Sequence, residues 1–454
     1  MIKKSPLRSN VLLWGFALSC VVSTQLFSQY NNPAFYLPVI PPLKVTTNNT
    51  QPDLIPSTLA LDPLLSKQVT LPLKWKYGWA DGQRANTIGS AAAGDPLPKS
   101  TYYLSTGYSP QQISIAYGFT NLPAGDTGAG KIIAVIESYG NTNIQSDLNT
   151  FDAHYGIPAA TVHIAYPGGT PTSSDASWAE ETSLDVEWAH AMAPGATIWV
   201  IAAPDNTLAS LLTAVDYAVK TVKASVVSMS WGLDEFSTEK SYDSHFTNQT
   251  VTFIASAGDN QDTNWPSTSP YVLSVGGTTL TLDTNTSAII SETGWNGLND
   301  LSIIGPGEGG GGGFSQYEKQ PQYQNGYTGY TNNFKTIPDV SYNADPYTGF
   351  AIYFTAPGSS TGGWVVTAGT SAGPPQWAAI VAVCNWSTPK AGKLNFIWDA
   401  YNFYFGATTD ITVGSNGVYP ATAAYDLATG MGSPQVGVFG QSWYISYEPS
   451  TIYY

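Results

Sequence analysis

The sequence predicts an α/β protein in which helices cover both faces of a parallel β-sheet. Short apolar runs rich in β-branched residues recur along the chain, which is typical of strands buried on both faces. These runs are residues 131–136, 197–202, 225–229 and 251–256. Stretches with a helical pattern lie between them, such as 185–192 and 208–222. Strands that alternate with helices form parallel sheets, because each helix carries the chain back to the same end of the sheet.

Composition sets limits on both fold and function. The 454 residues are 43% hydrophobic and 13% aromatic, which allows a large packed core. Charged residues make up only 11%, well below the usual quarter, so uncharged polar residues must cover much of the surface. A net charge of −15 excludes nucleic acid as the expected partner. This acidity suits a protein that works at low pH, but an ordinary acidic secreted protein has the same composition.

The first 28 residues have the three parts of a secretory signal. Lys3, Lys4 and Arg8 are followed by the apolar run 11–22 and then by a polar stretch. The apolar run is shorter than a typical transmembrane helix, although an uncleaved signal anchor is an open alternative. Cys20 would leave with the leader, so no disulfide framework is expected.

Three further regions follow the leader. Residues 29–107 are rich in Pro, Asn, Thr and Tyr and have little periodicity, so we expect a poorly structured extension or a reduced pro-region. Residues 108–440 hold the strand and helix patterns and form the predicted main folded domain. Residues 441–454 form a Tyr-rich C-terminal tail with no evident role.

Segment 368–380 (AGTSAGPPQWAAI) places Ser371 between an apolar run and a predicted buried helix. At a helix N-terminus, the helix dipole and free backbone N–H groups favour developing negative charge. Gly369 permits close approach of the backbone, and proline is tolerated in the first helical turn. From these residues alone, Ser371 is either a nucleophile or a serine that only caps the helix.

Residues 181–196 predict a helix that carries a pair of carboxylates. Glu181 and Asp185 are four residues apart and therefore share one face of the helix. Two such carboxylates titrate as a coupled pair, which suits a base that works in acid. Glu180 and Glu187 fall off this face and are expected to be solvated. The alternative is that Glu181 and Asp185 are surface acids stabilised by the helix dipole.

The serine segment resembles the nucleophile motif of the subtilisin clan, whose base is a histidine followed by Gly-Thr. None of the four histidines here precedes that dipeptide. Together with the carboxylate helix, the segment instead resembles the sedolisin and kumamolisin family of serine-carboxyl peptidases. Further motifs follow in the order of that family: SMSWG at 228–232, ASAGD at 255–259, SPYVLSVGGT at 269–278, PDV at 338–340 and ADPYTG at 344–349. The resemblance covers residues 108–434.

The resemblance implies a subtilisin-like fold and a Ser–Glu–Asp triad. It makes Ser371 the nucleophile, Glu181 the general base and acid, and Asp185 the orienting partner. Asp259 matches the acid that lines the oxyanion hole, where it must be protonated to donate a hydrogen bond. Because Glu181 must accept a proton while Asp259 keeps one, this chemistry implies an acidic working pH.

The same resemblance makes Glu137 an accessory carboxyl of the proton network, with Trp231 as its neighbour. The alternative for Glu137 is a strand-end acid that points to water. Ser230, Trp231 and Gly232 would line the strand that pairs with an extended peptide substrate. The glycine run 309–313 is followed by no Gly-Lys-Ser/Thr, so it is not a phosphate loop. It is either a flexible wall of the substrate cleft or a floppy loop.

Near the C-terminus, the sequence resembles the single calcium site of the family. The resemblance implies one structural Ca²⁺ held by the carboxylates of Asp410 and Asp426 and by the carbonyls of Ile411, Thr422 and Ala424. The family usually has glycine at the last two carbonyl positions, where the loop needs unusual φ angles. Two aspartates that only stabilise turns are the alternative.

We therefore expect a secreted, monomeric endopeptidase that cleaves polypeptides in acid, with no membrane span once the leader is removed. Two other functions remain open: a catalytically silent secreted protein that keeps the fold for binding or surface assembly, and a glycosidase that uses two carboxylates. The family also carries a large folded pro-domain that residues 29–107 do not resemble. That region is either a reduced substitute, or the enzyme needs no such chaperone.

Overall fold

The computed structural model describes residues 77–80, 83–85, 106–248, 250–297, 308–325, 328–330, 333–384 and 406–439. All of them belong to one compact unit of the chain, Leu61–Tyr454. The predicted leader, most of the predicted extension and the predicted tail lie outside the described residues.

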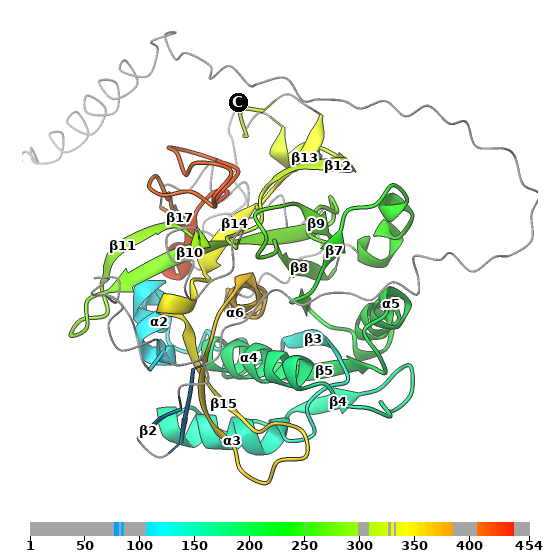
Figure 1. The fold of residues 1–454 in the computed structure, drawn as a ribbon, viewed down its shortest axis with the longest axis vertical. Helices are drawn as coiled ribbons and strands as arrows, with labels where there is room; N and C mark the ends of the chain where they lie inside the picture. The colour runs from blue at the N-terminus through cyan, green and yellow to red at the C-terminus, as the bar shows by residue number, and fades with distance from the viewer. Residues whose placement is uncertain are drawn as a thin grey trace, which may run out of the picture. The chain divides into compact units, whose positions relative to one another are not determined.

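A mixed sheet of eight strands forms the centre of this unit (Figure 1). Its order is β11-β10-β8-β6-β3-β5-β4, with β14 also paired to β10, and every pairing is parallel except β10–β11. The four strands predicted from apolar runs are all present as neighbours. The strand bounds are β3 Ile132–Ser138, β4 His163–Ala165, β5 Thr197–Ala203, β6 Val226–Met229, β8 Thr252–Ser256, β10 Val272–Leu282, β11 Ile289–Gly294 and β14 Val340–Asn343.

Helices pack on both faces of this sheet, as predicted. In β3, Ile133 and Val135 belong to one hydrophobic core and Ala134 and Ile136 to another, because successive side chains of a strand point to opposite faces. The first core includes residues of α4 and α6, and the second includes residues of α5. The helix bounds are α2 Pro110–Ala116, α3 Ile144–Tyr155, α4 Ala176–Met192, α5 Leu208–Tyr217 with a π-helical end at Ala218–Val222, and α6 Gly373–Val383.

A second sheet, with order β15-β16-β1-β2, is antiparallel throughout. Its strands β1 and β2 come from the region predicted to be a poorly structured extension, and β1 pairs with β16, which leads directly to Ser371. The bounds are β1 Tyr77–Ala80, β2 Gln83–Ala85, β15 Phe350–Phe354 and β16 Gly363–Thr367.

Three short ladders and several 3₁₀ turns complete the described elements. The ladders pair β7 Leu233–Asp234 with β9 Asn264–Trp265, β12 Gly313–Lys319 with β13 Phe334–Ile337, and β17 Thr408–Thr409 with β18 Ser433–Pro434. The 3₁₀ turns are η2 Phe119–Asn121, η4 Glu239–Ser241, η5 Asp243–Phe246, η7 Gln322–Gln324, η8 Pro346–Thr348 and η9 Thr370–Ala372.

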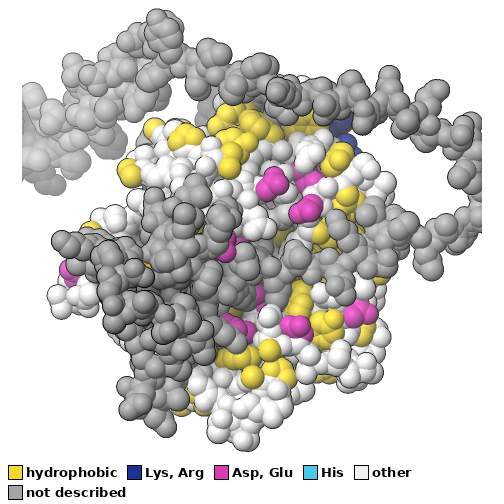
Figure 2. Space-filling model, in the orientation of Figure 1, with side chains coloured by type: hydrophobic (Ala, Val, Ile, Leu, Met, Phe, Trp, Pro, Cys, Tyr) yellow, Lys and Arg dark blue, Asp and Glu magenta, His cyan; other side chains and the backbone are white. Residues whose placement is uncertain are grey.

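The surface agrees with the low content of charged residues. On the face drawn in Figure 2, Asp and Glu side chains are spread among apolar and uncharged polar ones, and basic side chains are visible only at one margin. The described part of that face therefore offers no basic patch for phosphates. Within the described parts of the chain, none of the helices has the length and apolar character that a bilayer crossing requires.

Candidate active site

The candidate residues gather at the carboxyl edge of the central sheet. Glu137 is the second-last residue of β3, Ser230 follows the end of β6, and Asp259 follows the end of β8. Since β3, β6 and β8 are parallel neighbours, their carboxyl ends lie along the same edge. This edge is where open α/β sheets generally bind ligands.

Ser371 lies in the short turn η9 between β16 and α6. Gly369 has a φ of 106°, in the left-handed region, which lets the chain turn sharply before the serine. The Ser371 side chain is buried, and its Oγ has no hydrogen-bond partner among the described residues. The N-cap of α6 is Ala372, and no side chain caps this helix. The interpretation of Ser371 as a capping serine is therefore wrong.

Asp185 of α4 is connected to Ser371 through Ser230. Ser230 Oγ donates to Asp185 Oδ2 at 2.7 Å and also lies 3.2 Å from the backbone oxygen of Ser371. Helix α4 packs against η9, and it begins at Ala176 because the Asp175 side chain accepts two N–H groups of its first turn. Glu181 lies one turn before Asp185, and both side chains are fully buried. The alternative of two surface acids is thus also wrong.

The expectation that Glu180 and Glu187 are solvated is wrong as well. Their exposed fractions are 3% and 0%, because α4 packs against α3, α6, β3 and β15 and has no open face at these positions. Glu187 Oε2 accepts the N–H of Tyr353 at 3.0 Å. Burial raises the pKa of Glu187 well above its usual value, and the charges of Asp147 and Asp152 add to this increase.

Asp259 contacts the residue that precedes Ser371. Its Oδ1 accepts the N–H of Thr370 at 2.8 Å and the Thr370 hydroxyl at 2.6 Å. The hydroxyl oxygen of Thr370 in turn accepts the N–H of Gly258 at 3.1 Å. A carboxyl whose Oδ1 accepts two donors leaves Oδ2 as the oxygen that carries the proton when the group is neutral. The sequence analysis assigned no role to Thr370, although this residue stands beside Ser371 in the G-T-S motif.

Glu137 and Trp231 both lie in the interior. Glu137 is fully buried, so the alternative of a strand-end acid that points to water is wrong. Trp231 is also fully buried, and its Nε1 donates to the backbone oxygen of Ile136 at 3.2 Å. The indole is thereby held beside the strand that carries Glu137. Gly232 lies next to Asn264, and a Cβ at Gly232 would stand 2.8 Å from Asn264 Oδ1.

The glycine run 309–313 is neither a flexible wall nor a floppy loop. All five residues are buried. A Cβ at Gly311 would overlap the backbone oxygen of Ala257, and one at Gly312 would overlap that of Leu427. The glycines are therefore required for close packing of backbone against backbone. Their sequence alone carried no sign of this, because the partners are distant in the chain.

The predicted metal ligands lie in one loop region. Ala424 N donates to Asp410 Oδ2, and Thr422 N donates to Asp426 Oδ2, both at 2.8 Å. Ala424 has a φ of 65°, an angle that glycine adopts more easily. In the described parts of the chain, no three His, Cys, Asp or Glu side chains cluster as a metal site. A cation here would therefore need backbone carbonyls, such as that of Ile411, in addition to the two carboxylates.

Comparison with known proteins agrees with this geometry. The model of the subtilase family matches residues 169–394. Kumamolisin from Bacillus sp. (strain MN-32) is 34% identical over 378 residues, which cover 76% of this chain and 65% of kumamolisin. Sedolisin from Pseudomonas sp. (strain 101) is 27% identical over 388 residues, covering 76% of this chain and 62% of sedolisin. In sequence, the chain is similar to peptidases of the sedolisin family.

A solved structure supports the same assignment for the fold. Pseudomonas sedolisin, described as a serine-carboxyl proteinase and complexed with two molecules of pseudo-iodotyrostatin, aligns with a TM-score of 0.65 at 25% identity. The alignment covers 75% of this chain and 99% of that one, so this chain has the sedolisin fold. The chain nevertheless spans less than two thirds of the length of the curated sedolisin-family relatives named here.

Proposed function

We propose that this chain is a serine-carboxyl endopeptidase of the sedolisin family that hydrolyses polypeptides in acid. One observation carries the proposal: Ser371 has a buried, unbonded Oγ among the described residues, between two acids that reach it through neighbouring groups. Ser230 connects Asp185 to Ser371, and Thr370 connects Asp259 to Ser371. The relatives named above, one of them described as a serine-carboxyl proteinase, support the same activity.

In the proposed reaction, Ser371 Oγ attacks the carbonyl carbon of the scissile bond while its proton moves to Glu181. Asp185 orients Glu181 and balances the proton that it gains. Asp259 donates a hydrogen bond to the oxyanion of the tetrahedral intermediate. Glu181 then protonates the leaving amine, and water attacks the acyl-enzyme with Glu181 again as the base. Glu137 would extend the proton network, with Trp231 beside it.

The site would place the substrate against residues 230–232. These residues form an extended connection between β6 and β7 at the carboxyl edge of the sheet, where a peptide backbone can pair by β-addition. Ser230 and Gly232 would contribute backbone groups to this pairing, because the Ser230 hydroxyl is bonded to Asp185. An acidic working pH follows from the chemistry, since Asp259 must be neutral while Glu181 accepts a proton.

A protein-digestion assay from pH 2 to pH 8 tests the proposal. The wild-type protein should cleave a denatured protein substrate in acid, and both Ser371→Ala and Glu181→Gln should abolish cleavage. A correctly folded wild-type protein without activity at any of these pH values would favour a silent binding protein. Activity that survives Ser371→Ala would show that the site is wrongly assigned. Asp234→Asn, at an exposed position, serves as the control.

We also propose one structural Ca²⁺, held by Asp410 and Asp426 together with the carbonyls of Ile411, Thr422 and Ala424. The two carboxylates lie in one loop region, and carboxylate and carbonyl oxygens are the ligands that Ca²⁺ prefers. Such an ion would stabilise the loop and take no part in bond cleavage. Chelation should lower the melting temperature of the wild-type protein and leave that of Asp410→Asn unchanged. An equal melting temperature with and without chelator would remove the proposal.

Secretion, a monomeric state and the absence of a membrane span in the mature protein complete the proposed function. The signal-like residues 1–28 support secretion. Expression of the full chain followed by N-terminal sequencing of the protein in the medium would test it. A protein that keeps its first 28 residues and stays with the cells would contradict it.

A further inference from the structure

Residues 309–312 of the glycine run form backbone hydrogen bonds with the turn that carries Asp259, both before and after that residue. Gly311 N donates to Gly258 O at 2.7 Å, and Gly309 N donates to Asp259 O at 2.9 Å. On the return side, Gln261 N donates to Gly309 O at 3.1 Å. Three backbone hydrogen bonds therefore determine the path of the chain immediately before, at and after Asp259.

Close packing holds the run itself in place. Any Cβ at Gly311 would overlap the backbone oxygen of Ala257, two residues before Asp259. Gly311 does not have a positive φ, so an alanine there meets this overlap without added backbone strain. The buried side chain of Asn416 donates to Gly310 O at 2.9 Å. The run thus contacts both Asn416 and the Asp259 turn, and Gly311 has no room for a side chain.

We propose that Gly309 and Gly311 are positioning residues for Asp259 in the oxyanion hole. The inference rests on the proposed function, because it assigns the run a role in that same site. Thr370 fixes one carboxyl oxygen of Asp259, and the glycine run fixes the backbone that carries the carboxyl. Hydrogen-bond donors in an oxyanion hole act only when they are aimed at the developing charge, so a misplacement of about 1 Å can cost roughly 100-fold in rate.

Gly311→Ala tests the inference most directly. The variant should bind substrate with little change in KM and lose roughly 10- to 100-fold in kcat, up to the effect of removing one oxyanion donor. In an Asp259→Ala background the same change should cost almost nothing more, because a residue that acts through Asp259 has no effect once that carboxyl is gone.

The control for crowding alone is Gly168→Ala, at an exposed position. A Cβ there would also be crowded, at 2.8 Å from Pro204 Cδ, and Gly168 likewise has no positive φ. Its effect on kcat should be small, and the effects of Gly168→Ala and Asp259→Ala should be additive. Equal losses of kcat in Gly168→Ala and Gly311→Ala would overturn the inference.

A milder variant decides the matter if Gly311→Ala does not fold. Gln261 Nε2 donates to Glu308 O at 2.7 Å, beside the run, and Gln261 has a φ of 60°. Gln261→Asn tolerates that angle but has a shorter side chain. It should lower kcat with an unchanged KM, and again only when Asp259 is present.

The outcomes separate this inference from the proposed function. Suppose that Ser371→Ala abolishes cleavage, but the effects of Gly311→Ala and Gln261→Asn add to that of Asp259→Ala. The proposed peptidase function is then supported, and the positioning role of the glycines is wrong. If Ser371→Ala retains activity, the proposed site itself fails.

Discussion

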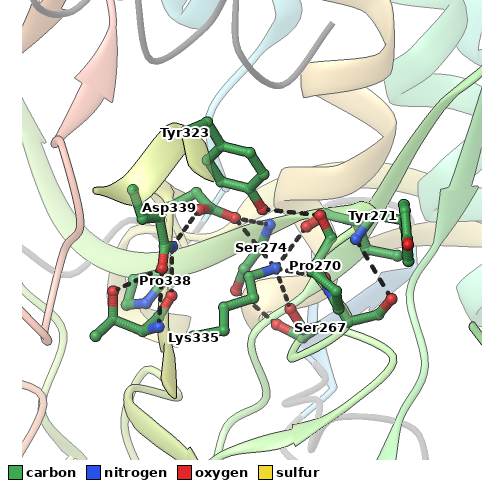
Figure 3. A network of polar contacts seen from close by, with 12 residues as sticks. Ser267, Pro270, Tyr271, Ser274, Tyr323, Lys335, Pro338 and Asp339 are labelled. Carbon is green, nitrogen blue, oxygen red and sulfur yellow. Dashed lines mark hydrogen bonds and ion pairs between the residues drawn. The ribbon is translucent and has the colours of Figure 1, made fainter. Parts of the chain in front are cut away.

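Two buried polar networks in this protein differ in how their central side chain, Ser371 in one and Lys335 in the other, is bonded. Around Ser371, buried acids gather beside a hydroxyl that has no partner among the described residues. Around Lys335, a fully buried ammonium donates to the carbonyls of Ser267, Ser269 and Val272 at 2.9, 2.7 and 2.7 Å. Figure 3 shows this second network, with Asp339 on the other side of the ammonium at 3.6 Å.

The network around Lys335 connects several segments of the chain and has a structural role. Asp339 also accepts the N–H of Ser274 and the side-chain amide of Gln324, so both of its oxygens are bonded. Burial lowers the pKa of Lys335, and the charge of Asp339 opposes this decrease. We therefore expect the network around Lys335 to stabilise the fold, whereas the proposed chemistry uses the Ser371 hydroxyl, which has no partner among the described residues.

Ser371→Ala should give the largest effect on activity and almost none on stability. Loss of the nucleophile should reduce kcat by roughly 10³- to 10⁶-fold. Because its Oγ has no partner among the described residues, its removal should leave the melting temperature within a few degrees of the wild type. A large drop in melting temperature would show that Ser371 has a structural role and would break the comparison.

Lys335→Met should have the opposite pattern. Three buried carbonyls would lose their donor and Asp339 its cation, which costs about 3–5 kcal/mol in the free energy of unfolding. Urea denaturation measures this loss. Lys220→Met is the control, because Lys220 is 71% exposed and its pair with Asp216 should contribute less than about 1 kcal/mol. Equal free energies of unfolding for the two variants would contradict a structural role for the Lys335 network.

Stability should also fall as the pH rises. Burial raises the pKa of Glu239 from 4.5 to about 9, so between these values the folded state keeps a proton that the unfolded state loses. Raising the pH across this window therefore favours unfolding, by at most about 1.4 kcal/mol per pH unit for each such group. Glu318, with a pKa raised to about 7, and Glu187 act in the same direction.

Urea denaturation at pH 4, 6 and 8 checks this prediction. The free energy of unfolding should be highest at pH 4, and Glu239→Gln should make it depend less on pH, because the neutral amide does not titrate. Asp234→Asn, at an exposed position, should leave the pH dependence as it is. A wild-type protein that is equally stable at pH 4 and pH 8 would contradict the prediction.

Most of the fold could be predicted from local patterns. The runs 131–136, 197–202, 225–229 and 251–256 became β3, β5, β6 and β8, since continuous β-branched apolar segments are stable only when both faces are covered. Helix α4 was expected from its pattern, but the burial of Glu180 and Glu187 was not, because polarity within a helix does not reveal what packs around it.

For the candidate site, too, the sequence predicted some features and the tertiary structure decided the others. Residue types and spacing made Ser371 and the Glu181–Asp185 pair candidates, because a helix brings residues four apart onto one face. Their roles were assigned only through the resemblance to the sedolisin family. The sequence thus determined the chemical groups and their order along the chain. Only the tertiary structure decided that Thr370 holds Asp259, that the glycine run 309–312 lies against the Asp259 turn, and that Lys335 is buried. These contacts join residues from 48 to 111 positions apart, and no local pattern records which distant backbone will lie beside a glycine or a lysine.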